Sequence, residues 1–396
     1  MAMQQTWRWF GPQDPIDLEQ VKQTGATGVV TALHQVPVGE IWTIDNINER
    51  KQYIENAGLS WSVVESLPVH EEIKQRSGNH RQYIENYKQS LRNLGRCGID
   101  TVCYNFMPVL DWSRTDLGVV FSDGTITTKF DAALFAAFDL YILERPGADK
   151  DYSSAQIEKA NTLFKQLDEK GRSKLTETVL LGLPGSLQAL TLEKFRSAVM
   201  AYQSISESEL EQNLHEFIRE IVPVAEEAGV RMSIHPDDPP WSLLGLPRIV
   251  GTKGNIERLL NVVDSPANGL TFCTGSLGAA YNNDLVSMAE KFSPRINFVH
   301  LRNLTRNEQG DFMEAYHLAG DVDLYGVIKV LLLEQKRRID SGRKDTRLPM
   351  RPDHGMLMKA EQNVAGIYPG YSLLGRMRGL AELRGLEAGI IGSLGL

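Results

Sequence analysis

The chain of 396 residues has little cysteine, no long apolar run and no excess of basic residues. Its three cysteines are too few for a disulfide framework, which favours a reducing compartment, the cytoplasm. No stretch reaches the roughly 18 apolar residues of a transmembrane helix, so we expect no membrane contact. With 42 Lys and Arg against 50 Asp and Glu, the net charge of −8 argues against a nucleic-acid partner.

Sequence motifs for nucleotide binding and for a serine nucleophile are also missing. The chain contains no G-x-G-x-x-G, no G-x-x-x-x-G-K-[ST] and no G-x-S-x-G. These motifs mark dinucleotide sites, P-loops and the nucleophile turn of α/β-hydrolases. A function in any of these classes is therefore not expected.

Short runs of β-branched and aromatic residues alternate along the chain with segments of helical periodicity. Several runs are apolar nearly throughout, as in parallel strands buried on both faces. The runs cover residues 6–11, 28–34, 60–66, 101–108, 230–236, 270–276, 296–302 and 348–355. The helical segments cover residues 14–25, 45–58, 80–98, 207–229, 253–263, 283–292, 322–342 and 371–386. Eight strands alternating with helices predict one α/β domain over residues 1–396, a closed (β/α)8 TIM barrel.

One interval breaks this alternation. About 100 residues separate the fourth predicted strand from the next crossover helix, and they include helical stretches rich in acidic residues and lysine. Since a barrel of this kind needs roughly 250 residues, we predict a helical insertion, residues 109–206, on the C-terminal face. It would act as a cap or support a homodimer. The glycine-rich end, residues 389–396, is expected to be a loose tail.

Four residues with metal-binding side chains stand at the ends of four successive predicted strands. They are His235, Cys273, His300 and Asp353. Residues at the same level of neighbouring parallel strands meet at one mouth of a barrel. Each residue alone is more often structural, a core cysteine or a capping aspartate for example, but their joint occurrence predicts one divalent metal site. Two imidazoles, a thiolate and a carboxylate suit Zn²⁺, with Fe²⁺ and Mn²⁺ also open.

Two arginines lie two positions from a candidate ligand. Arg302 follows one strand-end histidine and Arg351 precedes the strand-end aspartate, so each shares the ligand's side of its strand. An arginine there either binds a substrate carboxylate or holds an acid such as Asp237, Asp238 or Asp353 in an internal ion pair.

Other polar residues are expected at the same mouth. His354 and Tyr371 are candidate acid–base groups, unless they are structural hydrogen-bond partners. Arg8 and Asn105, at the ends of the first and fourth strands, are candidate contacts for substrate hydroxyls. Further residues near the predicted mouth are Glu65, His70 and His317.

The order of several long motifs resembles one known family. The motifs include VCYNFMPVLDW, IHPDDPP, FCTGS, FVHLRN, HLAGDVDLY, RPDHG and PGYSLLGR. In this order they are similar to bacterial mannonate dehydratase of the hexuronate pathway, along nearly the whole chain. The resemblance implies a xylose-isomerase-like barrel that dehydrates D-mannonate to 2-keto-3-deoxy-D-gluconate with Mn²⁺ or Fe²⁺.

The resemblance also implies roles for particular residues. The four strand-end residues named above match the metal ligands of the family. His354 and Tyr371 match its catalytic neighbourhood, although Tyr368 lies close enough in the sequence to compete with Tyr371. Two alternatives stay open: a metal-dependent sugar isomerase or epimerase on the same barrel, and a non-catalytic protein that binds sugar acids.

Overall fold

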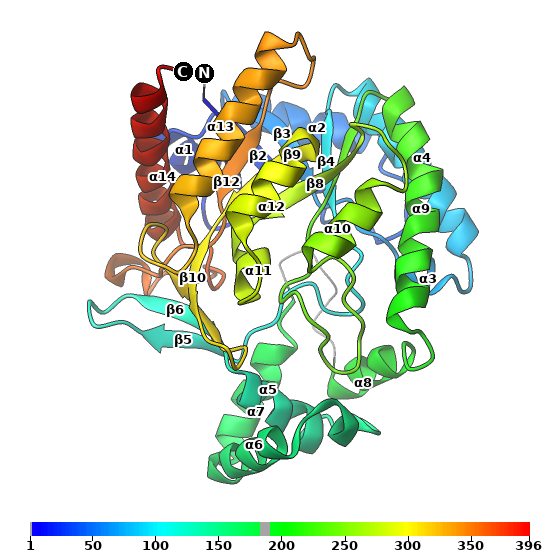
Figure 1. The fold of residues 1–396 in the computed structure, drawn as a ribbon, viewed down its shortest axis with the longest axis vertical. Helices are drawn as coiled ribbons and strands as arrows, with labels where there is room; N and C mark the ends of the chain where they lie inside the picture. The colour runs from blue at the N-terminus through cyan, green and yellow to red at the C-terminus, as the bar shows by residue number, and fades with distance from the viewer. Residues whose placement is uncertain (1, 183–190) are drawn as a thin grey trace.

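The computed structural model describes residues 2–182 and 191–396. Eight parallel strands close into a barrel in the order β1-β12-β9-β8-β7-β4-β3-β2. They are β1 (Gln4–Arg8), β2 (Gly28–Thr31), β3 (Ser60–Glu65), β4 (Thr101–Tyr104), β7 (Arg231–Ile234), β8 (Asn268–Cys273), β9 (Ile296–Leu301) and β12 (Pro349–Pro352). Each lies within a few residues of a strand expected from the sequence, so the predicted (β/α)8 barrel is confirmed (Figure 1).

Helices follow the barrel strands and pack around them. They are α1 (Leu18–Gln23), α2 (Ile44–Asn56), α4 (His80–Arg96), α9 (Glu207–Glu227), α10 (Lys253–Leu260), α12 (Leu285–Phe292), α13 (Leu324–Asp340) and α14 (Leu373–Leu394). Helix α9 begins at a capping box formed by Ser206 and Glu209, and it buries Leu214, Phe217 and Ile221 at helical spacing. Among the described residues, no helix combines the length and apolar character needed to cross a membrane.

The long interval after β4 holds a hairpin as well as helices. The hairpin is formed by β5 (Asp116–Val120) and β6 (Ile126–Phe130), and the helices are α5 (Ala132–Tyr141), α6 (Ser154–Gln166), α7 (Glu169–Val179) and α8 (Leu192–Met200). Part of the interval predicted as an insertion, residues 183–190, lies outside the described residues. Shorter elements elsewhere are α3 (Glu71–Gln75), α11 (Thr274–Ala279), and the 3-10 turns η1 (Ala148–Asp151), η2 (Ser293–Arg295) and η3 (Lys359–Glu361).

A second sheet, absent from the sequence prediction, stands beside the barrel. Strands β10 (Asn303–Arg306) and β11 (Phe312–Ala315) form a hairpin directly after β9, and β11 pairs antiparallel with β6. The result is a four-stranded sheet in the order β10-β11-β6-β5. Figure 1 shows it between the barrel and the lobe formed by α5, α6 and α7.

The prediction that residues 389–396 form a loose tail is wrong, because helix α14 continues to Leu394. Glycines 389 and 392 lower helix propensity and suggested an early end. Packing overrides them: Ile390 is 1% exposed in the main core, and the N–H of Met3 donates a 2.6 Å hydrogen bond to Oε1 of Glu387. The last helix therefore ties the C-terminus to the first strand.

This packing predicts a sharp difference between two truncations. Removing residues 387–396 is expected to lower the free energy of unfolding by roughly 3–6 kcal/mol, from one buried isoleucine and one hydrogen bond to a charged acceptor. Removing residues 392–396 leaves both contacts in place, and residues 392–395 are exposed, so a loss below about 1 kcal/mol is expected. Urea unfolding followed by circular dichroism measures both, and equal losses would show that α14 does not hold β1 in this way.

Candidate active site

Strand register brings the four candidate metal ligands together. Cys273 of β8 and His300 of β9 are direct neighbours across the sheet, and Arg351 of β12 is the neighbour of His300 on the other side. Ligand atoms of His235, Cys273 and His300 lie within 4.8 Å of one another. Oδ2 of Asp353, one residue past the end of β12, lies 3.7 Å from the Cys273 sulfur. Four side chains far apart in the sequence thus meet at the C-terminal mouth of the barrel.

The two imidazole rings are oriented by their outer nitrogens. Nδ1 of His235 donates to the carbonyl oxygen of Pro236 at 2.7 Å, and Nε2 of His300 lies 3.4 Å from Oε2 of Glu65. The remaining nitrogens, Nε2 of His235 and Nδ1 of His300, face each other at 3.1 Å. Donation by Nδ1 leaves a lone pair on Nε2 of His235, and the carboxylate of Glu65 beside Nε2 of His300 favours a lone pair on its Nδ1, which is the arrangement of metal-binding histidines. Together with the sulfur of Cys273 and the carboxylate, these residues fit a divalent cation.

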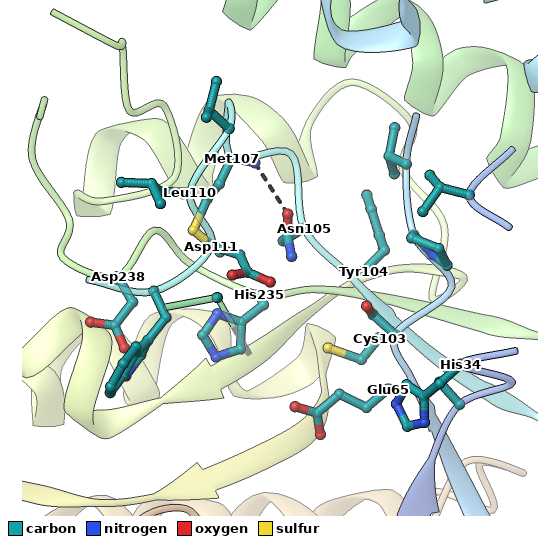
Figure 2. A pocket seen from close by; sticks show the side chains of 18 of the residues that line it. His34, Glu65, Cys103, Tyr104, Asn105, Met107, Leu110, Asp111, His235 and Asp238 are labelled. Atoms are coloured by element: carbon teal, nitrogen blue, oxygen red, sulfur yellow. Dashed lines mark hydrogen bonds between the residues drawn. The ribbon is translucent and has the colours of Figure 1, made fainter. Parts of the chain in front are cut away.

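A cavity of about 230 Å³ opens at the same mouth. Predicted site residues that line it are Arg8, Glu65, His70, Asn105, His235, Arg351, Asp353, His354 and Tyr371, whereas His317 is not among the described residues that do. Cys273 and His300 lie deeper, with no exposed surface. Figure 2 shows how Asn105 and His235 face this space from neighbouring strand ends. The cavity therefore gives a small molecule access to one side of the candidate metal site.

His354 and Tyr371 pack against each other on the wall of the cavity. Their rings meet edge to face with centroids 5.2 Å apart. Gly370, at a φ of +83°, lets the chain cross over the His354 ring, where a Cβ would lie 3.2 Å from Cγ. The carbonyl of Tyr371 accepts a 2.9 Å hydrogen bond from the buried guanidinium of Arg376. Tyr368 instead donates to the carbonyl of Gly182 and does not line the cavity among the described residues, so of the two phenols Tyr371 is the one at the cavity wall.

The two arginines near the ligands have different surroundings. Arg351 lines the cavity and pairs with Glu65 at 2.8 Å and with Asp353 at 2.5 Å. Arg302 is 1% exposed and is not among the described residues that line the cavity. It holds Asp238 at 2.7 Å and lies 3.5 Å from Asp353. Of the two roles open to Arg302 from the sequence, the structure favours the internal ion pair.

Charge around Asp353 keeps it ionised. Burial would raise the pKa of this carboxyl, but Arg351 and then His354, His300 and Arg302 hold it well below its usual range. An ionised carboxylate presents only acceptor oxygens, so Asp353 is in the form that a cation binds.

Two acidic residues that the sequence analysis does not single out belong to this site. Asp111 lines the cavity after β4, and Figure 2 shows its carboxylate between Asn105 and His235. Burial raises the pKa of Asp111. Glu314 of β11 lies 3.1 Å from Nδ1 of His354. A signal for Asp111 was its place in the motif VCYNFMPVLDW, whereas Glu314 lies on β11, a strand whose existence the sequence did not indicate.

A family profile and curated relatives all match this chain to mannonate dehydratase. A profile of D-mannonate dehydratase (UxuA) matches residues 3–392. Mannonate dehydratase of Marinomonas sp. (strain MWYL1) is 52% identical over 99% of this chain and 100% of its own length. The enzyme of the same name from Chromohalobacter salexigens is 53% identical over 98% of this chain and 99% of its own length.

Solved structures extend the comparison to three dimensions. The crystal structure of mannonate dehydratase from Streptococcus suis serotype 2 is 37% identical, covers 100% of this chain and 95% of that chain, and superimposes with a TM-score of 0.77. D-Psicose 3-epimerase from Clostridium cellulolyticum H10 has a TM-score of 0.51 at 11% identity, over 98% of this chain and 99% of that chain, and shares the fold alone. The full-length profile match and the relatives above 50% identity show that this chain belongs to the D-mannonate dehydratase family.

Proposed function

We propose that this protein is a metal-dependent dehydratase that converts D-mannonate to 2-keto-3-deoxy-D-gluconate and water, in hexuronate catabolism. The observation that carries the proposal is the meeting of His235, Cys273 and His300 within 4.8 Å, at a cavity that His354 and Tyr371 line. Membership of the D-mannonate dehydratase family supports the choice of a sugar acid as substrate.

We propose one Mn²⁺ or Fe²⁺ per chain, held by His235, Cys273, His300 and Asp353. A mixed nitrogen, sulfur and oxygen donor set suits a first-row transition ion, whereas Mg²⁺ and Ca²⁺ prefer oxygen donors. When bound, such an ion acts as a Lewis acid that stabilises negative charge on oxygen. The family resemblance supports Mn²⁺ or Fe²⁺ over Zn²⁺.

Dehydration of an aldonate requires a base near C2 and an acid near C3. A proton next to a carboxylate is only weakly acidic, because its removal places a second negative charge on the acid. In our proposal, one of His354 and Tyr371 takes the C2 proton and the other gives a proton to the C3 hydroxyl, which leaves as water. The resulting enol then takes up a proton at C3, loses the proton of its C2 hydroxyl and becomes the 2-keto acid.

The remaining cavity residues bind and orient the substrate. Arg8 and Arg351 place positive charge at the wall of the cavity, where it compensates the substrate carboxylate. The Oδ1 atom of Asn105 accepts from the N–H of Met107 at 3.3 Å, which leaves its amide NH₂ to donate to a hydroxyl. We propose that Arg302, which lies 3.5 Å from Asp353, holds this carboxylate in place.

We also propose that residues 109–206 close the cavity on the C-terminal face. This is supported by Leu180, Gly182 and Phe195, which come from that interval and line the cavity. Closing the cavity in this way would keep bulk water away from a reactive enol. A cytoplasmic location and a homodimer stay predictions from the sequence.

The test is an assay of the purified protein after loading with Mn²⁺ or Fe²⁺. With D-mannonate we expect stoichiometric formation of a 2-keto-3-deoxy acid, and we expect none from the metal-free protein. Elemental analysis should find about one transition ion per chain, which the donor set accommodates.

Two outcomes would contradict the proposal. Interconversion of aldoses and ketoses without formation of a keto acid would assign the chain to the isomerases. Tight binding of mannonate by a metal-free protein, with no turnover after metal is added, would indicate a binding protein.

A further inference from the structure

Glu314 reaches the candidate active site from outside the barrel. It lies on β11 of the four-stranded sheet, where its Cα neighbour on β10 is Leu304. Its side chain is buried, and alternate residues of β11 share this buried face, including Phe312. The sheet that the sequence did not predict therefore delivers one carboxylate to the barrel mouth.

The contacts of Glu314 link it to the reactive histidine and to the ligand side of the site. Oε1 lies 3.1 Å from Nδ1 of His354 and 2.5 Å from Arg114, and Oε2 lies 2.7 Å from Nε of Arg302. Arg302 in turn approaches Asp353. Within the described part of the chain, Nδ1 of His354 is buried and completes no hydrogen bond of good geometry, so the carboxylate of Glu314 at 3.1 Å is the acceptor within its reach.

We propose that Glu314 is a positioning residue, which accepts a hydrogen bond from Nδ1 of His354 and thereby fixes the orientation and the tautomer of this ring. The proposal rests on the function proposed above, in which His354 transfers a proton. It also gives a role to the second sheet, which holds Glu314 in place through β11.

The physical reason lies in the chemistry of the imidazole ring. A neutral imidazole carries its proton on either nitrogen, and a carboxylate at Nδ1 favours the form with Nδ1–H. That form leaves the lone pair on Nε2, which lies 4.0 Å from Oδ1 of Asp353 at the barrel mouth. Burial would raise the pKa of Glu314, but Arg302, His354 and Arg114 lower it, so the group accepts hydrogen bonds and donates none.

The kinetic test compares Glu314→Gln and Glu314→Asp with the wild type, all loaded with the same metal. Loss of an orienting carboxylate is expected to lower kcat by roughly 10–100-fold, with KM changed less than about threefold, since Glu314 is not among the described residues that line the cavity. Glu308→Gln is the matched control, because Glu308 is exposed in the loop between β10 and β11, and it should keep the wild-type kcat.

A double-mutant cycle separates positioning from general support of the fold. If Glu314 acts through His354, adding Glu314→Gln to His354→Ala should cost little further turnover. An equal further loss in the double variant would overturn the proposal. Glu314→Asp keeps the charge beside Arg114 and Arg302, so it replaces Glu314→Gln in the cycle if the latter does not fold.

A spectroscopic readout tests the same contact without relying on activity. With ¹⁵N-histidine and the diamagnetic ion Zn²⁺, the His354 signals are those missing from His354→Ala. We expect the shifts of the Nδ1–H tautomer in the wild type and a change toward the other tautomer or a mixture in Glu314→Gln. The Nε2–H tautomer in the wild type would overturn the proposal, whereas the expected shifts in a protein inactive on mannonate would contradict only the proposed function.

Discussion

Replacement of Cys273 by alanine is expected to remove the metal and to lower turnover on D-mannonate by about 1,000-fold or more. Lewis-acid stabilisation of developing charge contributes several kcal/mol, and each 1.4 kcal/mol corresponds to a factor of ten in rate. The sulfur of Cys273 lies among the candidate ligands, with no exposed surface. Elemental analysis after gel filtration and an assay of keto-acid formation measure the two effects together.

Cys97→Ala is the matched control for this experiment. Cys97 is also buried, but it lies at the C-terminal end of α4, and its backbone carbonyl rather than its sulfur accepts the hydrogen bond from Lys51. We expect this variant to keep its metal and its turnover. A Cys273→Ala protein with a full complement of metal and near-normal turnover would remove Cys273 from the ligand set.

His354→Ala and Tyr371→Phe are each expected to lower kcat by about 100-fold or more while the metal stays bound. General acid and general base catalysis each contribute factors of about 100 to 10,000, and neither residue is one of the proposed ligands. Both side chains line the cavity and their rings are in contact. Steady-state kinetics together with metal analysis of each variant make the measurement.

Tyr368→Phe is the control for the phenol. The Tyr368 hydroxyl donates to the carbonyl of Gly182, and Tyr368 is not among the described residues that line the cavity. Removing this hydroxyl should therefore change kcat far less than Tyr371→Phe does. A near-normal rate for Tyr371→Phe, with a large loss for Tyr368→Phe, would reverse the assignment of the two tyrosines.

The barrel was predictable because most of its strands are buried along their whole length. In β8, NGLTFC, and β9, INFVHL, every residue is buried, so each strand appears in the sequence as an apolar run with a functional residue at or near its end. The parallel pairing then places Cys273 opposite His300. The same apolar runs in the sequence therefore predicted both the barrel fold and the candidate metal ligands.

The second sheet was not predictable on these grounds. Strands β5 and β10 contain exposed and half-exposed residues, and β11 alternates buried with half-exposed ones, so none of them is buried throughout as most barrel strands are. The pairing of β11 with β6 joins residues about 180 positions apart, such as Phe130 and Phe312, and no local signal encodes that distance. Glu314 was missed for this reason, since its position depends on the pairing.

The contacts of a charged side chain likewise could not be predicted from its position in the sequence. Arg302 and Arg351 each lie two positions from a candidate ligand, so the sequence assigned them the same alternatives. Only the fold shows that Asp238 and Glu314 enclose Arg302, while Arg351 reaches the cavity. The C-terminal tail was misjudged in the same way, because its glycines are visible in the sequence and the core that receives Ile390 is not.

The most direct test of the central claim is an anomalous-difference map from crystals of the protein grown with Mn²⁺. We expect one strong peak per chain at the barrel mouth, within bonding distance of His235, Cys273, His300 and Asp353. No peak there in a protein that dehydrates mannonate with Mn²⁺, or a peak bound by other residues, would contradict the proposed metal centre and the chemistry built on it.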